Sequence, residues 1–137
     1  MSQLIRQLAL ILAAALLPAA ASAALQLRWR SETPLQPGEI RPSTARLWSH
    51  HQVLWVDIRP PARFEAAHIP GAFNCPPEQW TTGSQEVLAR WSAEKAVVIY
   101  GDDDQETQAH AMSQRMREQL GFETTYVLKG GWQAWRR

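Results

Sequence analysis

Three short apolar segments, separated by stretches of helical periodicity, constrain the fold of this chain more than any other feature. They are QVLWVDI at 52–58, AVVIY at 96–100 and TTYVL at 124–128. The first two are continuously apolar rather than alternating, which is the pattern of a strand covered on both faces. A helix is predicted over 104–120, because four apolar residues recur at helical spacing: Ala109, Met112, Met116 and Leu120. Strands that alternate with helices predict crossover connections and a parallel sheet.

Shorter elements fill the intervals between these segments. The sequence predicts short helices at 43–48, 61–68 and 84–92, and a brief strand at 71–76. Ser43 would cap the first of these helices. The third would place Val87, Leu88 and Trp91 on one apolar face. The long helix would end at the glycine that follows it, and a last helix would follow a pair of glycines near the C-terminus.

The first 23 residues, MSQLIRQLALILAAALLPAAASA, have the form of a secretory signal peptide. A basic residue, Arg6, precedes an apolar run, Pro18 breaks that run, and small residues suit cleavage after Ala23. The alternative is an uncleaved membrane anchor, but a run of ten apolar residues is too short to span a bilayer core about 30 Å thick. We therefore expect a periplasmic or secreted protein without a stable membrane anchor after cleavage. An extended lead-in would follow at 24–38 and a single domain at 39–137.

The charge balance and the cysteine content of the chain argue against a nucleic-acid partner and against an internal disulfide. The chain has 14 basic and 13 acidic residues, and loss of Arg6 with the signal peptide leaves 13 of each. No basic patch emerges, which argues against a nucleic-acid partner. The one cysteine, Cys75, cannot form an internal disulfide, so the fold has to rest on a hydrophobic core.

The densest motif of the chain is VDIRPPARFEAAHIPGAFNCP, at 56–76. Asp57 and Arg59 end a predicted buried strand, while Pro70 and Gly71 force a turn after His68. A charged pair beside a histidine is compatible with catalysis. Each residue also has a structural explanation, in which the aspartate accepts from loop amides, the arginine pairs with a carboxylate and the histidine bonds the turn. From these residues alone, the structural explanation is favoured.

Two segments of the chain resemble the signatures of the rhodanese-like family. VLWVDIRPPARFEAAHIPGAFNCP, at 53–76, resembles the first signature, with Ala67 where glycine is common. YVLKGGWQAW, at 126–135, resembles the closing signature and contains Gly130, Gly131 and Trp132. The resemblance covers about 39–136 and implies a three-layer α/β/α domain with a five-stranded parallel sheet. It also implies chemistry in the loop after the fourth strand, where a cysteine thiolate accepts a sulfur atom and passes it on as a persulfide. Backbone amides, a helix N-terminus and often an arginine stabilise that anion.

The loop that follows AVVIY departs from the family's pattern. It consists of Gly101, Asp102, Asp103, Asp104, Gln105, Glu106 and Thr107. Gly101 stands where the resemblance places the cysteine, and Glu106 stands where it places the arginine. A glycine cannot act as a nucleophile, and four carboxylates would repel thiosulfate or a persulfide anion. The sequence therefore predicts a degenerate active-site loop with no catalytic residue of its own.

The acidic residues of this loop have two explanations. Carboxylates at the start of a helix can cap free amides and complement the dipole, so that the side chains fill the anion seat that a substrate would have used. This explanation is favoured. The rival is weak Ca²⁺ binding, although the glycine and the spacing of an EF-hand loop are absent and no acidic partner can be named elsewhere in the chain.

Other candidate residues have structural explanations that are favoured over functional ones. Cys75 is a fallback nucleophile, but a free cysteine usually packs as a small hydrophobe. The pair His50 and His51 has no further ligand to complete a metal site, so a surface position is expected. Four tryptophans are expected in the core: Trp55, Trp91, Trp132 and Trp135.

Taken together, these features predict an exported, rhodanese-like protein that has lost sulfurtransferase activity and acts as a binding or regulatory module. Another exported protein is the expected partner, and no cofactor or metal ion is expected. The leading alternative is a sulfurtransferase or persulfide sulfur carrier that acts through Cys75, and a third possibility is a cation-binding module that uses the acidic loop. A phosphatase is excluded, since 101–107 contain neither cysteine nor arginine.

Overall fold

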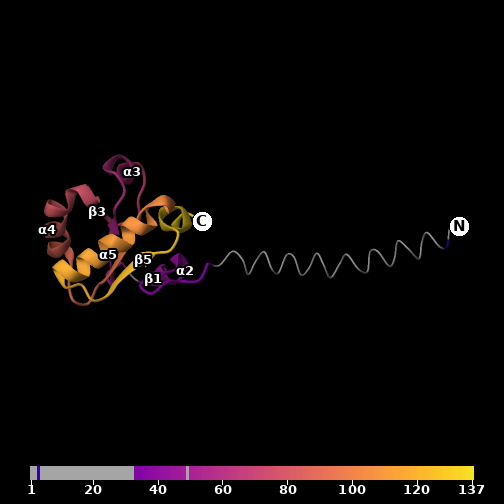
Figure 1. Cartoon of the computed structure of the whole chain (residues 1–137), viewed down its shortest axis with the longest axis horizontal. Coiled ribbons are helices and arrows are strands. Elements are labelled where there is room, and N and C mark those ends of the chain that lie inside the picture. The colour runs from indigo at the N-terminus through magenta and orange to yellow at the C-terminus, as the bar shows by residue number, and fades with distance from the viewer. Residues whose placement is uncertain (1–2, 4–32, 49) are drawn as a thin grey trace. The chain divides into compact units, whose positions relative to one another are not determined.

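The computed structural model contains a five-stranded, entirely parallel sheet with the strand order β1-β5-β4-β2-β3. Figure 1 shows the ribbon with β1, β3 and β5 labelled. The strands are β1 (Glu39–Ile40), β2 (Val53–Asp57), β3 (Phe73–Asn74), β4 (Ala96–Tyr100) and β5 (Thr125–Leu128). The helices are α2 (Pro42–Ala45), α3 (Pro61–Ala66), α4 (Trp80–Arg90), α5 (Glu106–Leu120) and α6 (Gly131–Trp135). Two 3-10 turns precede α4 and α5, namely η1 (Pro77–Gln79) and η2 (Asp103–Gln105). The predicted three-layer α/β/α class is confirmed.

The structure describes residue 3, residues 33–48 and residues 50–137. Leu35–Arg137 form a compact unit. Apart from residue 3, the predicted signal peptide at 1–23 lies outside the described residues, as does most of the lead-in at 24–38. Within the described part of the chain, no helix is long and apolar enough to cross a membrane.

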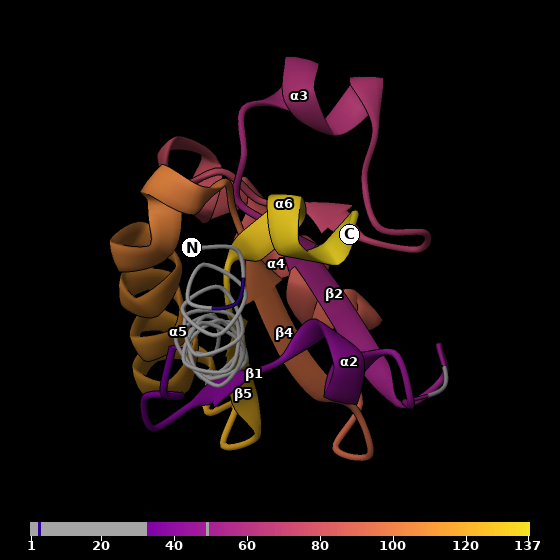
Figure 2. The same ribbon diagram turned by 90° about the vertical axis from the view of Figure 1, so that its right-hand side faces the viewer.

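The two central strands are covered on both faces, as their continuous apolar sequences predict. Alternate residues of β2 and β4 enter two separate core clusters. One cluster joins them to α4 and α5 and contains Leu54, Val56, Val87, Val97, Ile99, Met112 and Met116. The other lies toward α2 and α6, which Figure 2 shows in front of the strands, and contains Ala45, Val53, Trp55, Val98 and Tyr100, with Trp132 and Trp135 packed against it.

The long helix α5 matches its predicted apolar face. Ala109, Met112 and Met116 are buried, and Leu120 packs against the same cluster. The helix ends at Gly121, which has the left-handed φ of 72° that glycine adopts without a steric cost.

Three predictions about the short elements are wrong or incomplete. Ser43 lies inside α2 rather than at its N-cap, because Arg41 takes that position and Pro42 opens the helix. Helix α4 begins at Trp80, four residues before its predicted start. Leu88, expected on the apolar face of this helix, is 45 % exposed, since only the side of α4 that carries Val87 faces the sheet.

The register of the sheet brings the loops after β2 and β4 together. Asp57 is paired with Tyr100 at the carboxyl ends of these strands. The amide of Ile58 continues the ladder by donating to the Tyr100 carbonyl at 2.9 Å. In open parallel sheets, ligand sites lie at this edge. The residues that follow Asp57, Tyr100 and Leu128 therefore form the region in which a functional site is expected.

Candidate functional site

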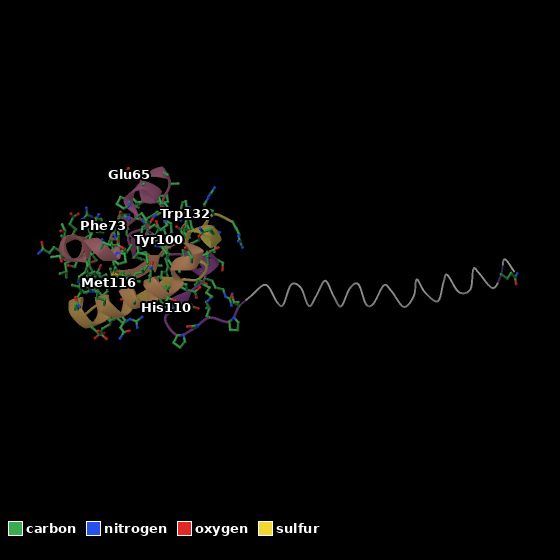
Figure 3. The ribbon with its side chains drawn as sticks, turned by 45° about the horizontal axis from the view of Figure 1, so that its top comes forward. Glu65, Phe73, Tyr100, His110, Met116 and Trp132 are labelled. Atoms are coloured by element: carbon green, nitrogen blue, oxygen red, sulfur yellow. The ribbon has the colours of Figure 1, made fainter. Side chains whose placement is uncertain are left out.

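The loop 101–107 is packed directly under the start of α6. The amide of Trp132 donates to the Gly101 carbonyl at 2.8 Å. The Tyr100 and Trp132 rings stack with their centroids 6.3 Å apart (both are labelled in Figure 3). A Cβ atom built on Gly131 would lie 2.3 Å from the same Gly101 carbonyl oxygen. Only glycine at position 131 allows the helix to approach the loop this closely.

Position 101 has little room for a side chain. Gly101 is buried, and a Cβ atom built there would lie 2.8 Å from the Gln105 Cβ and 3.1 Å from the Ile58 Cγ1. Real Cβ atoms do not approach neighbours as closely as 2.8 Å. A nucleophilic side chain at this position would require the Gln105 side chain to move.

Side chains satisfy two backbone amides of the loop, which are the groups that could otherwise face an anion. The Asp102 amide donates to the Gln105 Oε1 at 3.0 Å, and the Asp103 amide donates to the Gln133 Oε1 at 3.1 Å. The Asp102 side chain in turn accepts from the Gln105 amide and completes a capping box. Of the acids expected to cap the helix, Asp102 caps the 3-10 turn η2 that leads into α5, whereas the N-cap of α5 itself is Gln105, which makes no side-chain capping hydrogen bond.

The Asp102 carboxylate lies between two arginines of the segment that follows β2, Arg59 in the loop and Arg63 in α3. This side chain is 5 % exposed. It accepts a hydrogen bond from Arg63, and its Oδ1 lies 3.9 Å from the Arg59 Nη1. Its Oδ1 also accepts from the Gln133 Nε2 at 3.1 Å. An internal carboxylate therefore occupies a place that carries positive charge and several donors.

Two of the four carboxylates that were expected to repel an anion are paired with cations in the folded chain. Asp102 pairs with arginines, while Glu106 accepts from the Lys129 Nζ at 2.6 Å. Asp103 and Asp104 are exposed to solvent. The neutralising charges come from distant segments of the chain, so the local sequence of the loop did not reveal them.

Asp57 and Arg59 form a buried ion pair beside this carboxylate. The Asp57 Oδ1 accepts from the backbone amide of Arg59 at 2.9 Å, and its Oδ2 accepts from the Arg59 Nη2 at 2.7 Å. Burial alone would lower the pKa of Arg59, but the hydrogen bonds and the charge of Asp57 outweigh it and raise that pKa. The guanidinium also lies over the Trp132 ring, 4.6 Å from its centroid. These contacts give both residues a structural role at the floor of the loop.

The rest of the first motif shapes the turn that leads into β3. The His68 Nδ1 lies 2.7 Å from the Phe64 carbonyl oxygen, and the two rings stack with centroids 3.9 Å apart. Pro70 is exposed, and Gly71 has a left-handed φ of 79°. Sequence reasoning missed Asn74, whose Nδ2 donates to the Asp57 and Arg59 carbonyls at 3.0 and 2.9 Å. The position of Asn74 at the end of the motif HIPGAFN could have identified it from the sequence.

Cys75 lies in the core rather than at the loop. It is fully buried, and its Sγ would lie 2.5 Å from a Cβ atom built on Gly83 in α4. Burial raises the pKa of the Cys75 thiol to about 11, so the group is protonated at neutral pH. A buried, protonated thiol is a poor nucleophile. By contrast, His50 and His51 are exposed, as expected of surface residues.

A second cluster of ionisable side chains lies where β1 meets the start of α5. The Glu39 Oε1 accepts from the His110 Nε2 at 3.1 Å and from the Lys129 Nζ at 3.2 Å. Glu106 shares the same lysine. No acidic partner of the loop could be named from the sequence, but in the folded chain Glu39 lies beside Glu106.

Glu39 should make stability depend on acid pH. Burial by itself would raise the pKa of Glu39, but hydrogen bonds from Gln36, His110 and Lys129 outweigh it and lower the pKa to about 2 from 4.5. The resulting stabilisation is fully present above pH 4.5 and is lost as the pH falls through the folded value. At about 1.4 kcal/mol per pKa unit it amounts to something on the order of 3 kcal/mol.

The test is urea unfolding of Glu39→Gln and wild type at pH 7 and near pH 2. We expect the variant to lose about 2–3 kcal/mol at pH 7 and much less at the acid pH, where the wild-type carboxyl is itself being protonated. Glu123→Gln, at an exposed carboxylate, is the control and should change little at either pH. An equal loss for Glu39→Gln at both pH values would contradict the role assigned to its charge.

Comparisons with known proteins agree with this architecture. Residues 43–137 match the rhodanese-like domain family. A Bacillus halodurans protein of known crystal structure has a TM-score of 0.57 and 22% identity over 87% of this chain and 80% of its own. The rhodanese-like domain of an Anabaena sp. protein, solved by NMR, has a TM-score of 0.56 and 26% identity over 74% of each chain. A Rhodopseudomonas palustris protein of unknown function, described as a possible tyrosine phosphatase, has a TM-score of 0.52 and 21% identity over 72% of this chain and 78% of its own.

Proposed function

The chain belongs to the rhodanese-like family, and from that premise we propose that it is an exported, non-catalytic member that acts as a binding or regulatory module. The observation that carries the proposal is the filled loop after β4. Gly101 takes the position of the family's cysteine in this proposal, and a side chain there would require the Gln105 side chain to move. The Asp102 carboxylate takes the place of a bound anion between Arg59 and Arg63.

Electrostatics supports the same conclusion. A persulfide or thiosulfate needs pointed amides and local positive charge. In this loop the amides of Asp102 and Asp103 are bonded to glutamine side chains, and the nearby arginines face a carboxylate. An incoming anion would have to displace Asp102 from these partners. Sulfur transfer at this loop is therefore disfavoured for two reasons: the loop has no nucleophile, and the Asp102 carboxylate occupies the position of a bound anion.

The enzymatic alternative is sulfur transfer through Cys75. It requires a thiolate that a substrate can reach, whereas the Cys75 thiol is fully buried and its pKa is raised to about 11. Phosphatase activity, which the description of the Rhodopseudomonas palustris protein suggests for that protein, has no cysteine or arginine within 101–107 of this chain to support it.

The proposed partner is another exported protein, and the proposed location is the periplasm or the extracellular medium. These proposals rest on the form of residues 1–23 and on the balanced charge of the remainder. The same balance supports the absence of nucleic acid among the partners. No cofactor is proposed.

The experiment that tests the proposal is intact-mass analysis of the purified protein after exposure to thiosulfate and, separately, to polysulfide. Transfer of the sulfane sulfur of thiosulfate to a thiolate would leave a persulfide on the protein and release sulfite. We expect no reducible sulfur adduct, and we expect Cys75 to resist alkylation until the protein is unfolded. A stoichiometric adduct that disappears in Cys75→Ser would show that the protein is a sulfur carrier with a relocated nucleophile.

A further inference from the structure

The side chains of Glu39, Glu106 and His110 present three potential metal ligands to one point. The ligand atoms of these residues all lie within 4.8 Å of one another. Glu106 and His110 are four residues apart on α5 and so share one face of the helix. Glu39 reaches the same point from β1 at the edge of the sheet. We propose that these three side chains form a binding site for a divalent transition-metal ion of the Zn²⁺ class.

The donor set is the first argument for this class of ion. One imidazole nitrogen and two carboxylate oxygens match the N/O ligands of three-ligand zinc sites, in which water takes the fourth position. Ca²⁺ and Mg²⁺ prefer oxygen ligands alone, so the histidine selects against them. This site therefore differs in chemistry from the Ca²⁺ site considered for the acidic loop.

The geometry requires only modest side-chain movement. Bonds of about 2.1 Å place tetrahedral ligands roughly 3.4 Å apart, and the His110 Nε2 and Glu39 Oε1 are already 3.1 Å apart. The side chains of His110 and Glu106 are 32% and 36% exposed, which leaves them free to adjust. Glu39 is held in place, since its Oε2 accepts from the Gln36 amide at 2.7 Å. Such a hydrogen bond behind a ligand is how proteins orient metal-binding carboxylates.

A cation already occupies this point in the form of the Lys129 ammonium group. Its Nζ lies 3.2 Å from the Glu39 Oε1 and 2.6 Å from the Glu106 Oε1. The Glu39 side chain is fully buried, so its charge must be compensated locally. Lys129 is a flexible side chain that is 18% exposed and can turn toward solvent, whereas the two carboxylates would remain. A divalent ion would thus replace the ammonium and bring one more positive charge to the two carboxylates.

The test is calorimetric titration of the purified, EDTA-treated protein with Zn²⁺, alongside its thermal midpoint in the presence of the ion. Wild type should bind one ion with a rise in the midpoint. His110→Asn should bind at least tenfold more weakly, because it removes the nitrogen ligand. Lys129→Met should bind at least tenfold more tightly, because it removes the competing ammonium. The double variant His50→Asn/His51→Asn should bind as wild type does, since both histidines are exposed and lie outside the cluster.

Two results would overturn the proposal. The first is the absence of saturable, one-to-one binding in both wild type and Lys129→Met. The second is a His110→Asn variant that binds as tightly as wild type, which would place any bound ion elsewhere. Neither result tests the proposed absence of sulfur transfer, because none of the three metal-binding side chains contacts Asp102.

Discussion

Replacing Gly131 with alanine is expected to destabilise the protein by about 3 kcal/mol or more. Gly131 has a left-handed φ of 53°, and a Cβ atom there would lie 2.3 Å from the Gly101 carbonyl oxygen. That neighbour is backbone held in a buried loop, so it cannot move aside as a flexible side chain would. The shift would also weaken the 2.8 Å hydrogen bond from the Trp132 amide to Gly101. Urea unfolding measures the loss directly.

Gly121→Ala is the matched control for this prediction. Gly121 also has a left-handed φ, of 72°, but a Cβ atom built there meets nothing within 4 Å. It should therefore cost only the conformational penalty of about 1–2 kcal/mol. If Gly131→Ala were no more destabilising than Gly121→Ala, the close packing of α6 on the loop would not have the importance assigned to it.

The second large effect is expected for Arg59→Met, which should cost about 3–5 kcal/mol. The substitution leaves the Asp57 carboxylate fully buried without its charge partner. It also removes the hydrogen bond from the Arg59 Nη2 to the Ala67 carbonyl at 2.8 Å. Denaturant unfolding near pH 7 measures the loss directly.

Arg63→Met is the control that distinguishes loss of the buried ion pair from loss of any positive charge near the loop. Arg63 also pairs with a carboxylate, that of Asp102, but its side chain is 61% exposed. We expect its removal to cost less than about 1 kcal/mol. The double variant Asp57→Asn/Arg59→Met should recover part of the loss seen in Arg59→Met, since it removes the uncompensated charge. Equal losses for Arg59→Met and Arg63→Met would contradict the buried ion pair as the source of the loss in Arg59→Met.

The layered fold could be predicted from the sequence because its signals are local. The unbroken apolar runs of β2 and β4 follow from cover on both faces, and the two core clusters on either side of the sheet bear this out. The spacing of Ala109, Met112 and Met116 predicted the buried face of α5. Some of the short elements were missed or misplaced. Strand β1 has only two residues, too few for any periodicity, and was expected only from the family's five strands.

The contacts of the site could not be predicted, because they join residues far apart in the chain. Arg63 and Asp102 are 39 residues apart, and Lys129 and Glu39 are 90 apart. In the local sequence GDDDQET, every charged residue is an acid. In the folded chain, Arg59 from the loop after β2, Arg63 from α3 and Lys129 from the end of β5 all lie against it. A charge pattern in sequence therefore predicted the capping role of Asp102 but not its neutralisation.

We infer that the Asp102 carboxylate occupies, between Arg59 and Arg63, the position that a bound anion would take. Thiosulfate titration of the thermal midpoint, for wild type and Asp102→Ser side by side, tests it most directly. Serine retains an N-cap oxygen but vacates the space and the charge. We predict that wild type shows only the gradual response of a salt effect, whereas Asp102→Ser gains a saturable rise in midpoint from bound anion. A saturable rise in wild type, or its absence in Asp102→Ser, would contradict the account.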